Sequence, residues 1–188
     1  MRKLKLQMQM TINGFVGGVN GENEWMTWNP DDEFITFLVS LIDSSDTLLI
    51  GRKLAEGFIT FWEDTAQKNP AHPFAKKIAD IQKVVFTNTL DKSVWNNTTL
   101  AKGDLVEAIS GLKNQSGKDI LVFGGADFVS SLVNEGLIDE YHLIINPTAM
   151  SDGMTIFNSP GRIEKFTPMQ SKLYSGGKTV LSFKPKND

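Results

Sequence analysis

The sequence predicts an α/β protein with a mostly parallel central sheet, helices flanking it, and an antiparallel hairpin at the C-terminal end. Two observations lead to this fold class. Short apolar segments typical of strands alternate with amphipathic helical segments until the last third of the chain, which is the order of a parallel α/β sheet. In the last third strands follow strands, and residues 166–174 and 179–184 are joined by Ser175-Gly176-Gly177-Lys178, a hairpin turn.

Composition limits the class of protein. The 188 residues suit one domain spanning residues 1–188, and 40% hydrophobic with 22% charged residues indicates a globular chain. The formal net charge is −3 without a basic block, which argues against a nucleic-acid partner. The absence of cysteine excludes disulfides and thiol catalysis. His72 and His142 lie too far apart in the sequence to form a recognisable metal site.

The sequence also indicates where in the cell the protein is expected. No apolar run is long enough to span a membrane. The N-terminal residues are basic but lack the apolar segment of a signal peptide. We therefore expect a cytoplasmic protein without a membrane partner.

The first strand and the loop after it have distinct patterns. Residues 4–12 alternate apolar and polar side chains, which predicts a strand with one strongly apolar face. Residues 16–29, the tryptophan loop, are rich in glycine and carry Trp25 and Trp28. Such a loop is often a lid that covers a flat ligand. A surface loop anchored by its tryptophans fits the sequence equally well.

The next segments form a helix, a strand and a second helix. Asn29 is placed to cap the first helix, Pro30 suits its first position, and Asp31 and Asp32 favour the positive end of its dipole. An apolar strand at 47–50 then leads to Gly51-Arg52-Lys53 and a second helical pattern. Cations at such a turn can hold a phosphate, although two solvated charges are the simpler interpretation.

The middle of the chain continues this order. We expect a strand at 83–87, a polar segment around Asn96 and Asn97, and a helix capped by Asp104. Residues 120–123 form an apolar run that fits a strand buried on both faces. Gly124 and Gly125 end that run, and a helix follows until Gly136.

The strand, Gly-Gly turn and helix at 120–136 form the central motif. Two glycines allow a ligand to approach the backbone, and the N–H groups at the start of the helix suit a phosphate. On the pair alone, a tight turn between two core elements is the simpler interpretation, because the G-x-G-x-x-G and Walker A patterns are absent. The turns after Gly51, Thr87 and Gly124 are all expected at carboxyl ends of strands, where they can converge on one elongated ligand.

Taken together, these segments resemble the dihydrofolate reductase superfamily. The resemblance rests on Leu-Leu-Ile-Gly-Arg-Lys (48–53), Val-Val-Phe-Thr-Asn (84–88) and Val-Phe-Gly-Gly-Ala (122–126), in this order. The pattern Gly-Leu-Ile-Asp-Glu (136–140), Pro147, Gly153 and Phe157 is more specifically similar to the reductase domain of bifunctional riboflavin-biosynthesis proteins and to stand-alone bacterial relatives. The resemblance spans nearly the whole chain and implies a dihydrofolate reductase-like fold.

The resemblance also implies NADPH as cofactor and assigns residues to it. The pyrophosphate would be lined by Phe123, Gly124, Gly125, Ala126, Asp127, Phe128 and Val129. The adenosine side would be held by Gly51, Arg52 and Lys53, with Arg52 on the 2′-phosphate, and flanked by Phe86, Thr87 and Asn88. Met10 and Thr11, with the loop from Val16 to Gly21, would lie beside the nicotinamide.

Two positions depart from the folate enzymes. Many of these carry a basic residue near Asp127, and an aspartate there would repel the 2′-phosphate or face away, which leaves open whether NADPH or NADH is preferred. The folate enzymes also bind their pterin through an acidic residue on the first helix. Asp32 is our candidate for this catalytic role, and helix capping is the equally plausible alternative.

The leading hypothesis is an NADPH-dependent reductase of a small heterocyclic substrate, similar to 5-amino-6-(5-phosphoribosylamino)uracil reductase of riboflavin biosynthesis. The chain lacks the Cys-x-x-Cys of the zinc deaminase partner, and Arg162 is the only cation in the presumed substrate loops, 19–30 and 148–162. Both facts weaken the riboflavin assignment. Dihydrofolate reductase activity and a non-catalytic nucleotide-binding dimer are the alternatives. The family resemblance also implies a homodimer.

Overall fold

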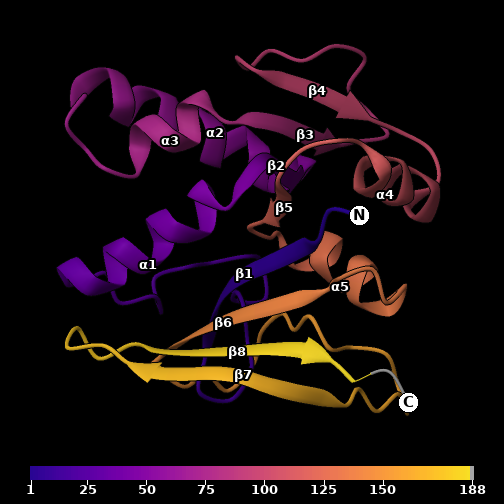
Figure 1. The fold of residues 1–188 in the computed structure, drawn as a ribbon. Coiled ribbons are helices and arrows are strands. Elements are labelled where there is room, and N and C mark those ends of the chain that lie inside the picture. The colour runs from indigo at the N-terminus through magenta and orange to yellow at the C-terminus, as the bar shows by residue number, and fades with distance from the viewer. Residues whose placement is uncertain (187–188) are drawn as a thin grey trace.

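The computed structural model describes residues 1–186, which form a single mixed sheet of eight strands with helices on both faces (Figure 1). The sheet has the order β4-β3-β2-β5-β1-β6-β8-β7. The strands are β1 (Leu4–Thr11), β2 (Ser45–Gly51), β3 (Gln82–Phe86), β4 (Thr98–Ala101), β5 (Asp119–Val122), β6 (Glu140–Asn146), β7 (Phe166–Leu173) and β8 (Thr179–Pro185). The helices are α1 (Asp32–Asp43), α2 (Arg52–Lys68), α3 (Ala75–Asp80), α4 (Leu105–Asn114) and α5 (Ala126–Asn134).

The strand directions confirm the predicted fold class. Strands β1 to β6 pair in parallel, whereas β8 runs antiparallel to both β6 and β7. The predicted C-terminal hairpin is therefore β7 and β8, added to one edge of a parallel sheet. This is a dihydrofolate reductase-like α/β fold.

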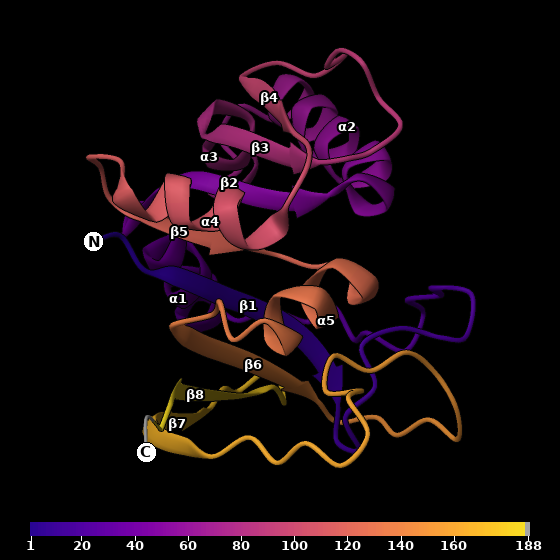
Figure 2. The ribbon, with the colours of Figure 1, turned by 90° about the vertical axis from the view of Figure 1, so that its right-hand side faces the viewer.

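Two apolar layers hold the helices against the sheet. Helices α1, α2 and α3 cover one face, and α4 and α5 cover the other (Figure 2). Neighbouring residues of a strand point to opposite faces, so that Leu48 and Ile50 enter the first layer while Leu49 enters the second. All three side chains are fully buried, as expected for a strand covered on both faces.

Strand β1 has the predicted apolar face, and its polar face is covered as well. Gln7 is buried on that second face, and the Nζ of Lys5 lies 2.8 Å from a carboxylate oxygen of Asp119 and 3.2 Å from the hydroxyl of Ser44. Because β1 lies in the middle of the sheet, α1 and these polar partners take the place of solvent. Alternation in the sequence alone does not distinguish such a covered polar face from an exposed one.

Strand β4 was missing from the predicted elements, which had only a polar segment between β3 and α4. It pairs in parallel with β3, from Lys83 opposite Thr98 to Phe86 opposite Ala101. As the edge strand it is only partly buried, so its residues need no apolar pattern. The neighbouring strand, rather than local sequence, decides that this segment is extended.

The carboxyl ends of β1, β2, β3, β5 and β6 lie at one edge of the sheet, to the right in Figure 2. Two long loops meet beyond this edge. Val16 N donates to Met154 O, and Met154 N donates to Gly17 O, both at 2.8 Å. The tryptophan loop and the loop of residues 147–165 are thus joined by backbone hydrogen bonds next to the ends of β1 and β6. Among residues 1–186, no helix is long and apolar enough to cross a membrane.

Candidate active site

Helices α2 and α5 both begin at the carboxyl edge without a capping side chain. Helix α2 follows β2 directly, and α5 follows β5 after three residues. The residue at each cap position is a glycine, Gly51 for α2 and Gly125 for α5, with no side-chain cap hydrogen bond. The first N–H groups of a helix have no partner within the helix, and they carry the positive end of its dipole. These two termini therefore present unsatisfied donors to the same edge of the sheet.

Helices α1 and α4 are capped by the side chains of their cap residues, whereas the cap residue of α3, Phe74, makes no such bond and a preceding histidine accepts instead. The carboxylate of Asp31 accepts from Phe34 N at 2.7 Å on α1, and that of Asp104 accepts from Glu107 N at 2.9 Å on α4. At α3, the Nδ1 of His72 accepts from Phe74 N and Ala75 N at 3.3 and 3.2 Å. The contrast singles out α2 and α5 as the helices whose N-termini remain open for an anion.

The two open termini touch each other. A Cβ atom built on Gly51 would lie 2.7 Å from the Cβ of Phe128, in the first turn of α5, so only glycine permits this packing. The ring of Phe86, opposite Gly51 in the register of β2 and β3, stacks on the ring of Phe128 with their centroids 5.5 Å apart. The turns after β2, β3 and β5 are therefore brought together, as the sequence predicted.

The Gly-Gly turn connects β5 to α5 beside this contact. Gly124 has φ +122° and is joined to Gly125 by a cis peptide bond. A Cβ built on Gly124 would lie 3.5 Å from the sulfur of Met8 and 3.6 Å from the side chain of Leu54, so these two side chains flank the bare backbone of the turn. The side chain of Phe123 packs away from the turn, with its ring centroid 5.6 Å from that of Phe58. Ala126 begins α5, and Val129 is buried in the core.

Both cations at the start of α2 are paired with carboxylates. The guanidinium of Arg52 bonds to Glu56 one turn later on the same helix. The Nζ of Lys53 lies 2.9 Å from a carboxylate oxygen of Asp127, so an ion pair joins the two open helix termini. Asp127 is thus close to the predicted phosphate site with its charge balanced by Lys53, a possibility that the sequence did not suggest.

The predicted adenosine residues at the end of β3 have different exposure. Thr87 is buried, and its Oγ1 accepts from Thr89 N and Leu90 N, both at 3.1 Å. The hydroxyl therefore shapes the turn itself. Asn88 is exposed beside it.

The predicted nicotinamide residues lie at the end of β1. Met10 and Thr11 are buried, and Thr11 Oγ1 accepts from Phe15 N at 2.9 Å, which folds the chain back at the start of the next loop. Val16 packs against the apolar layer of α4 and α5. Gly21 has φ +87° and makes a turn at which a side chain would be strained.

Asp31 and Asp32 have different surroundings. Asp31 caps α1, and its carboxylate also accepts from the hydroxyl of Ser175 at 2.7 Å and from Gly176 N at 3.0 Å, in the turn between β7 and β8. These bonds, with Ser175 first and Phe34 N next, lower the pKa of Asp31 to about 2. Asp32 begins the helix with an exposed side chain. The predicted cap at Asn29 is wrong, because the helix starts two residues later than expected.

Lys178 was missed in the sequence, where a lysine in a Gly-Gly-Lys turn is typically solvated. It is only 1% exposed and its Nζ donates to the main-chain oxygen of Thr27 and to the side-chain oxygen of Asn146. Asn146 ends β6, is fully buried, and donates to Gln9 Oε1 at 2.8 Å. Burial lowers the pKa of the Lys178 ammonium. The polar network connects β1, β6, the hairpin turn and the tryptophan loop beneath the carboxyl edge.

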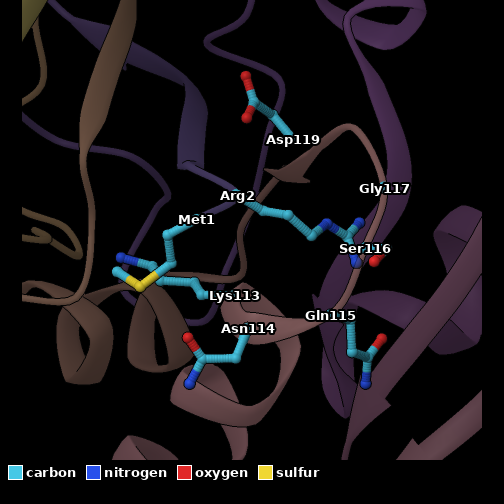
Figure 3. A pocket seen from close by; sticks show the side chains of 8 residues that line it. All are labelled: Met1, Arg2, Lys113, Asn114, Gln115, Ser116, Gly117 and Asp119. Carbon is cyan, nitrogen blue, oxygen red and sulfur yellow. The ribbon is translucent and has the colours of Figure 1, made fainter.

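A shallow hollow of the surface lies elsewhere. Its volume is about 450 Å³, and it is lined by residues before β1, at the end of α4 and at the start of β5, among them Arg2 and Lys113 (Figure 3). Arg2 bonds to Asp46, and the Nζ of Lys113 lies 2.6 Å from Asp139, so both charges are already balanced. Parallel α/β sheets bind ligands at the opposite edge, and we therefore place the site at the carboxyl ends. Within residues 1–186, no cluster of histidine and carboxylate side chains is arranged to hold a metal ion.

Comparison with known proteins agrees with this geometry. Residues 2–180 match the model of the RibD C-terminal domain. The chain belongs to the RibD C-terminal domain family. An uncharacterized relative of this family, YyaP from Bacillus subtilis strain 168, is 29% identical over 180 residues, which cover 94% of this chain and 91% of YyaP. A second uncharacterized protein of the same organism, YwjB, is 22% identical over 160 residues. The aligned residues cover 84% of this chain and 83% of YwjB.

Solved structures show the same RibD C-terminal fold. A protein from Shewanella sp. PV-4, named for riboflavin biosynthesis, superposes with a TM-score of 0.74 at 20% identity, and each chain is fully covered. The Thermotoga maritima diaminohydroxyphosphoribosylaminopyrimidine deaminase/5-amino-6-(5-phosphoribosylamino)uracil reductase superposes with a TM-score of 0.69 at 15% identity. That match covers 98% of this chain and 57% of the Thermotoga chain, so this chain spans little more than half of the bifunctional enzyme. The family as a whole is one of NAD(P)H-dependent reductases.

Proposed function

We propose that this protein is an NADPH-dependent reductase that transfers hydride to a small unsaturated heterocycle. One observation carries the proposal. The N-termini of α2 and α5 are uncapped and touch at Gly51 and Phe128. By contrast, α1 and α4 are capped by their own cap residues, and the N–H groups at the start of the short helix α3 donate to His72. Two adjacent open helix termini with two cations suit a ligand that carries phosphates at two places.

The residues at this edge fit NADPH. The backbone of Gly124, Gly125 and the first turn of α5 would hold the pyrophosphate, because the two glycines carry no side chain of their own. Arg52 and Lys53 would hold the 2′-phosphate, for which a guanidinium offers a planar fork of donors. Phe86, Thr87 and Asn88 would flank the adenosine, and Met10, Thr11, Val16 and Gly21 would lie beside the nicotinamide.

The bound cofactor would supply the hydride, and the protein would position the substrate and exclude water. The tryptophan loop is suited to this second task, because it lies against the loop of residues 147–165 at the carboxyl ends of β1 and β6. Trp28 is 60% exposed, and its ring is available to stack on a flat ring. Asp32 would orient the substrate or supply a proton, since the carboxylate of Asp31 is occupied as a cap and Asp32 is free on the surface.

The first experiment is a tryptophan-fluorescence titration of the purified protein with NADPH and NADH in parallel. We expect saturable binding that prefers NADPH. If neither nucleotide binds at millimolar concentration, the proposal is wrong and the open helix termini are only structural. Tight binding without oxidation of NADPH by any carbonyl, imine or pterin would favour a non-catalytic nucleotide-binding protein, and rapid turnover of dihydrofolate would favour a dihydrofolate reductase.

The role of Asp32 is tested separately. Asp32→Asn should abolish turnover of an identified substrate while the dissociation constant of NADPH stays within twofold. Asp64→Asn changes an exposed carboxylate near the C-terminal end of α2 and is the control. It should leave both the turnover and the dissociation constant of NADPH unchanged. Unchanged turnover in Asp32→Asn would leave this residue only an effect on the helix dipole. The homodimer implied by the family resemblance stays a prediction.

A further inference from the structure

We infer that the substrate of this protein is a flat heterocycle without a phosphate group, either uncharged or positively charged. This inference rests on the proposed function, because it takes the carboxyl ends of β1 and β6, with the tryptophan loop and the loop of residues 147–165, as the substrate side. The substrate named for the Thermotoga enzyme is a phosphoribosylamino uracil. The inference therefore separates this chain from that enzyme by the chemistry of the compound it binds.

The stretches of these two loops that adjoin β1, α1 and β6 carry negative charges and no positive ones, and the two cations of the loop of residues 147–165, Arg162 and Lys165, come at its end, just before β7. Residues 12–31 contain Glu22, Glu24 and Asp31, and residues 147–161 contain Asp152, without a lysine, arginine or histidine in either stretch. A phosphate is normally bound by arginine or lysine, or by the free N–H groups at the start of a helix. Neither of these two stretches supplies such a cation.

The cations that approach this side from the hairpin are already engaged. Lys178 is 1% exposed, and its ammonium group donates to Thr27 and Asn146. This ammonium group is therefore not accessible to a ligand at the surface. Lys172 is paired with Glu33 at the start of α1. A phosphate would have to displace buried hydrogen bonds or a carboxylate to reach either amine.

Arg162 is remote from the substrate side, although the sequence placed it in a substrate loop. Its guanidinium bonds to the main-chain oxygen of Asn134, and its Nε lies 2.5 Å from a carboxylate oxygen of Glu164. Asn134 is the last residue of α5, and α5 starts at the carboxyl edge. Arg162 is thus held at the opposite end of this helix.

The nearby helix terminus is also closed to an anion. Helix α1 begins beside the substrate loops, and the carboxylate of Asp31 accepts from Phe34 N in its first turn, which also places a negative charge there. The free termini of α2 and α5 are assigned to the cofactor. What the substrate side offers instead is carboxylates and exposed apolar surface at Ile12, Val19 and Trp28. Such a surface favours a flat, neutral or cationic ring.

The test uses wild-type protein saturated with NADPH, so that added nucleotides cannot bind at the cofactor site. Calorimetry then measures three matched pairs: 5-amino-6-(ribosylamino)uracil, uridine and guanosine, each with and without its 5′-phosphate. We expect at least one phosphate-free compound to bind, and at least tenfold more tightly than its phosphate. A phosphate that binds as tightly as its partner, or failure of all three phosphate-free compounds to bind, overturns the inference. Failure of NADPH itself to bind is seen in the saturation step and overturns the proposed function instead.

A charge variant gives a second readout. Glu24→Lys places a cation in the exposed part of the tryptophan loop, and it should reduce the preference for the phosphate-free compound several-fold, most strongly at low salt. Glu135→Lys makes the same change of charge beyond the far end of α5 and should leave the preference unchanged. Equal effects of both variants would show that only the net charge of the protein matters, and would overturn the assignment to these loops.

Discussion

The ammonium group of Lys178 donates a hydrogen bond to the main-chain oxygen of Thr27, which connects the turn of the C-terminal hairpin to the tryptophan loop across 151 residues of sequence. The same ammonium also donates to Asn146 at the end of β6. The position of the tryptophan loop therefore depends on a buried charge that has no carboxylate among these two hydrogen-bond partners.

Replacing Lys178 with methionine should loosen this loop. Methionine keeps the length of the side chain but leaves the oxygens of Thr27 and Asn146 without their donor, and a buried unsatisfied group costs about 1–3 kcal/mol. We expect acrylamide to quench tryptophan fluorescence more strongly than in wild type, while NADPH affinity changes less than twofold. Lys184→Met, at an exposed position of β8, is the control. Identical quenching in both variants would mean that Lys178 does not hold the loop.

Replacing Gly51 with alanine should disrupt the contact between α2 and α5. The added Cβ would lie 2.7 Å from the Cβ of Phe128, and overpacking of this kind costs about 1–3 kcal/mol. The melting temperature should fall by about 2–4 °C for each kcal/mol, and NADPH binding should weaken at least tenfold. Gly57→Ala, on the exposed side of α2 with no atom near the new Cβ, should instead be neutral or slightly stabilising.

Replacing Arg52 with alanine should weaken NADPH at least tenfold and NADH less than twofold, because only NADPH carries the 2′-phosphate. Glu56→Gln provides the reciprocal variant, since it releases Arg52 from its partner on α2 and should tighten NADPH binding. Both dissociation constants come from fluorescence titration. Equal losses of affinity for the two nucleotides in Arg52→Ala would show that Arg52 does not bind the 2′-phosphate.

Replacing Asp127 with asparagine should tighten NADPH binding about three- to tenfold. The change removes a negative charge beside the phosphate site and releases Lys53, whose ion pair with Asp127 is exposed and therefore worth only about 0–1 kcal/mol. The double variant Asp127→Asn with Lys53→Met should lose the gain if Lys53 turns to the phosphate. A weaker complex in the single variant would show that Asp127 supports the cofactor rather than opposing it.

The stability of the protein should depend on Asp31 between about pH 4 and pH 2. The pKa of Asp31 is lowered from 3.8 to about 2 by its hydrogen bonds to Ser175, Phe34 N and Gly176 N. Since the folded pKa lies below the unfolded one, the stabilisation is present above pH 3.8 and is lost as the pH falls toward 2. The difference in melting temperature between wild type and Asp31→Asn should accordingly shrink over this range. A constant difference would contradict the role of the ionised carboxylate.

Much of the fold and part of the site were predictable from the sequence, because they depend on local chemistry. The apolar run of β5, the glycines that end β2 and β5, and the Ser-Gly-Gly-Lys turn each favour one backbone conformation through their own residues. The order of strands and helices then limits the topology, because parallel strands need crossover helices and their carboxyl ends meet at one edge. This is why the turns after Gly51, Thr87 and Gly124 could be expected to lie together.

The rest was decided by residues that are distant in sequence. Strand β4 is extended because β3 pairs with it, and Asp31 is the cap of α1 while its second carboxylate oxygen binds the hairpin turn. Lys178 is buried because Asn146 and Thr27 satisfy its ammonium, and Asp127 is balanced because α2 places Lys53 beside it. A charged side chain is buried or paired only when the tertiary structure brings its partner, and no local pattern records where that partner is.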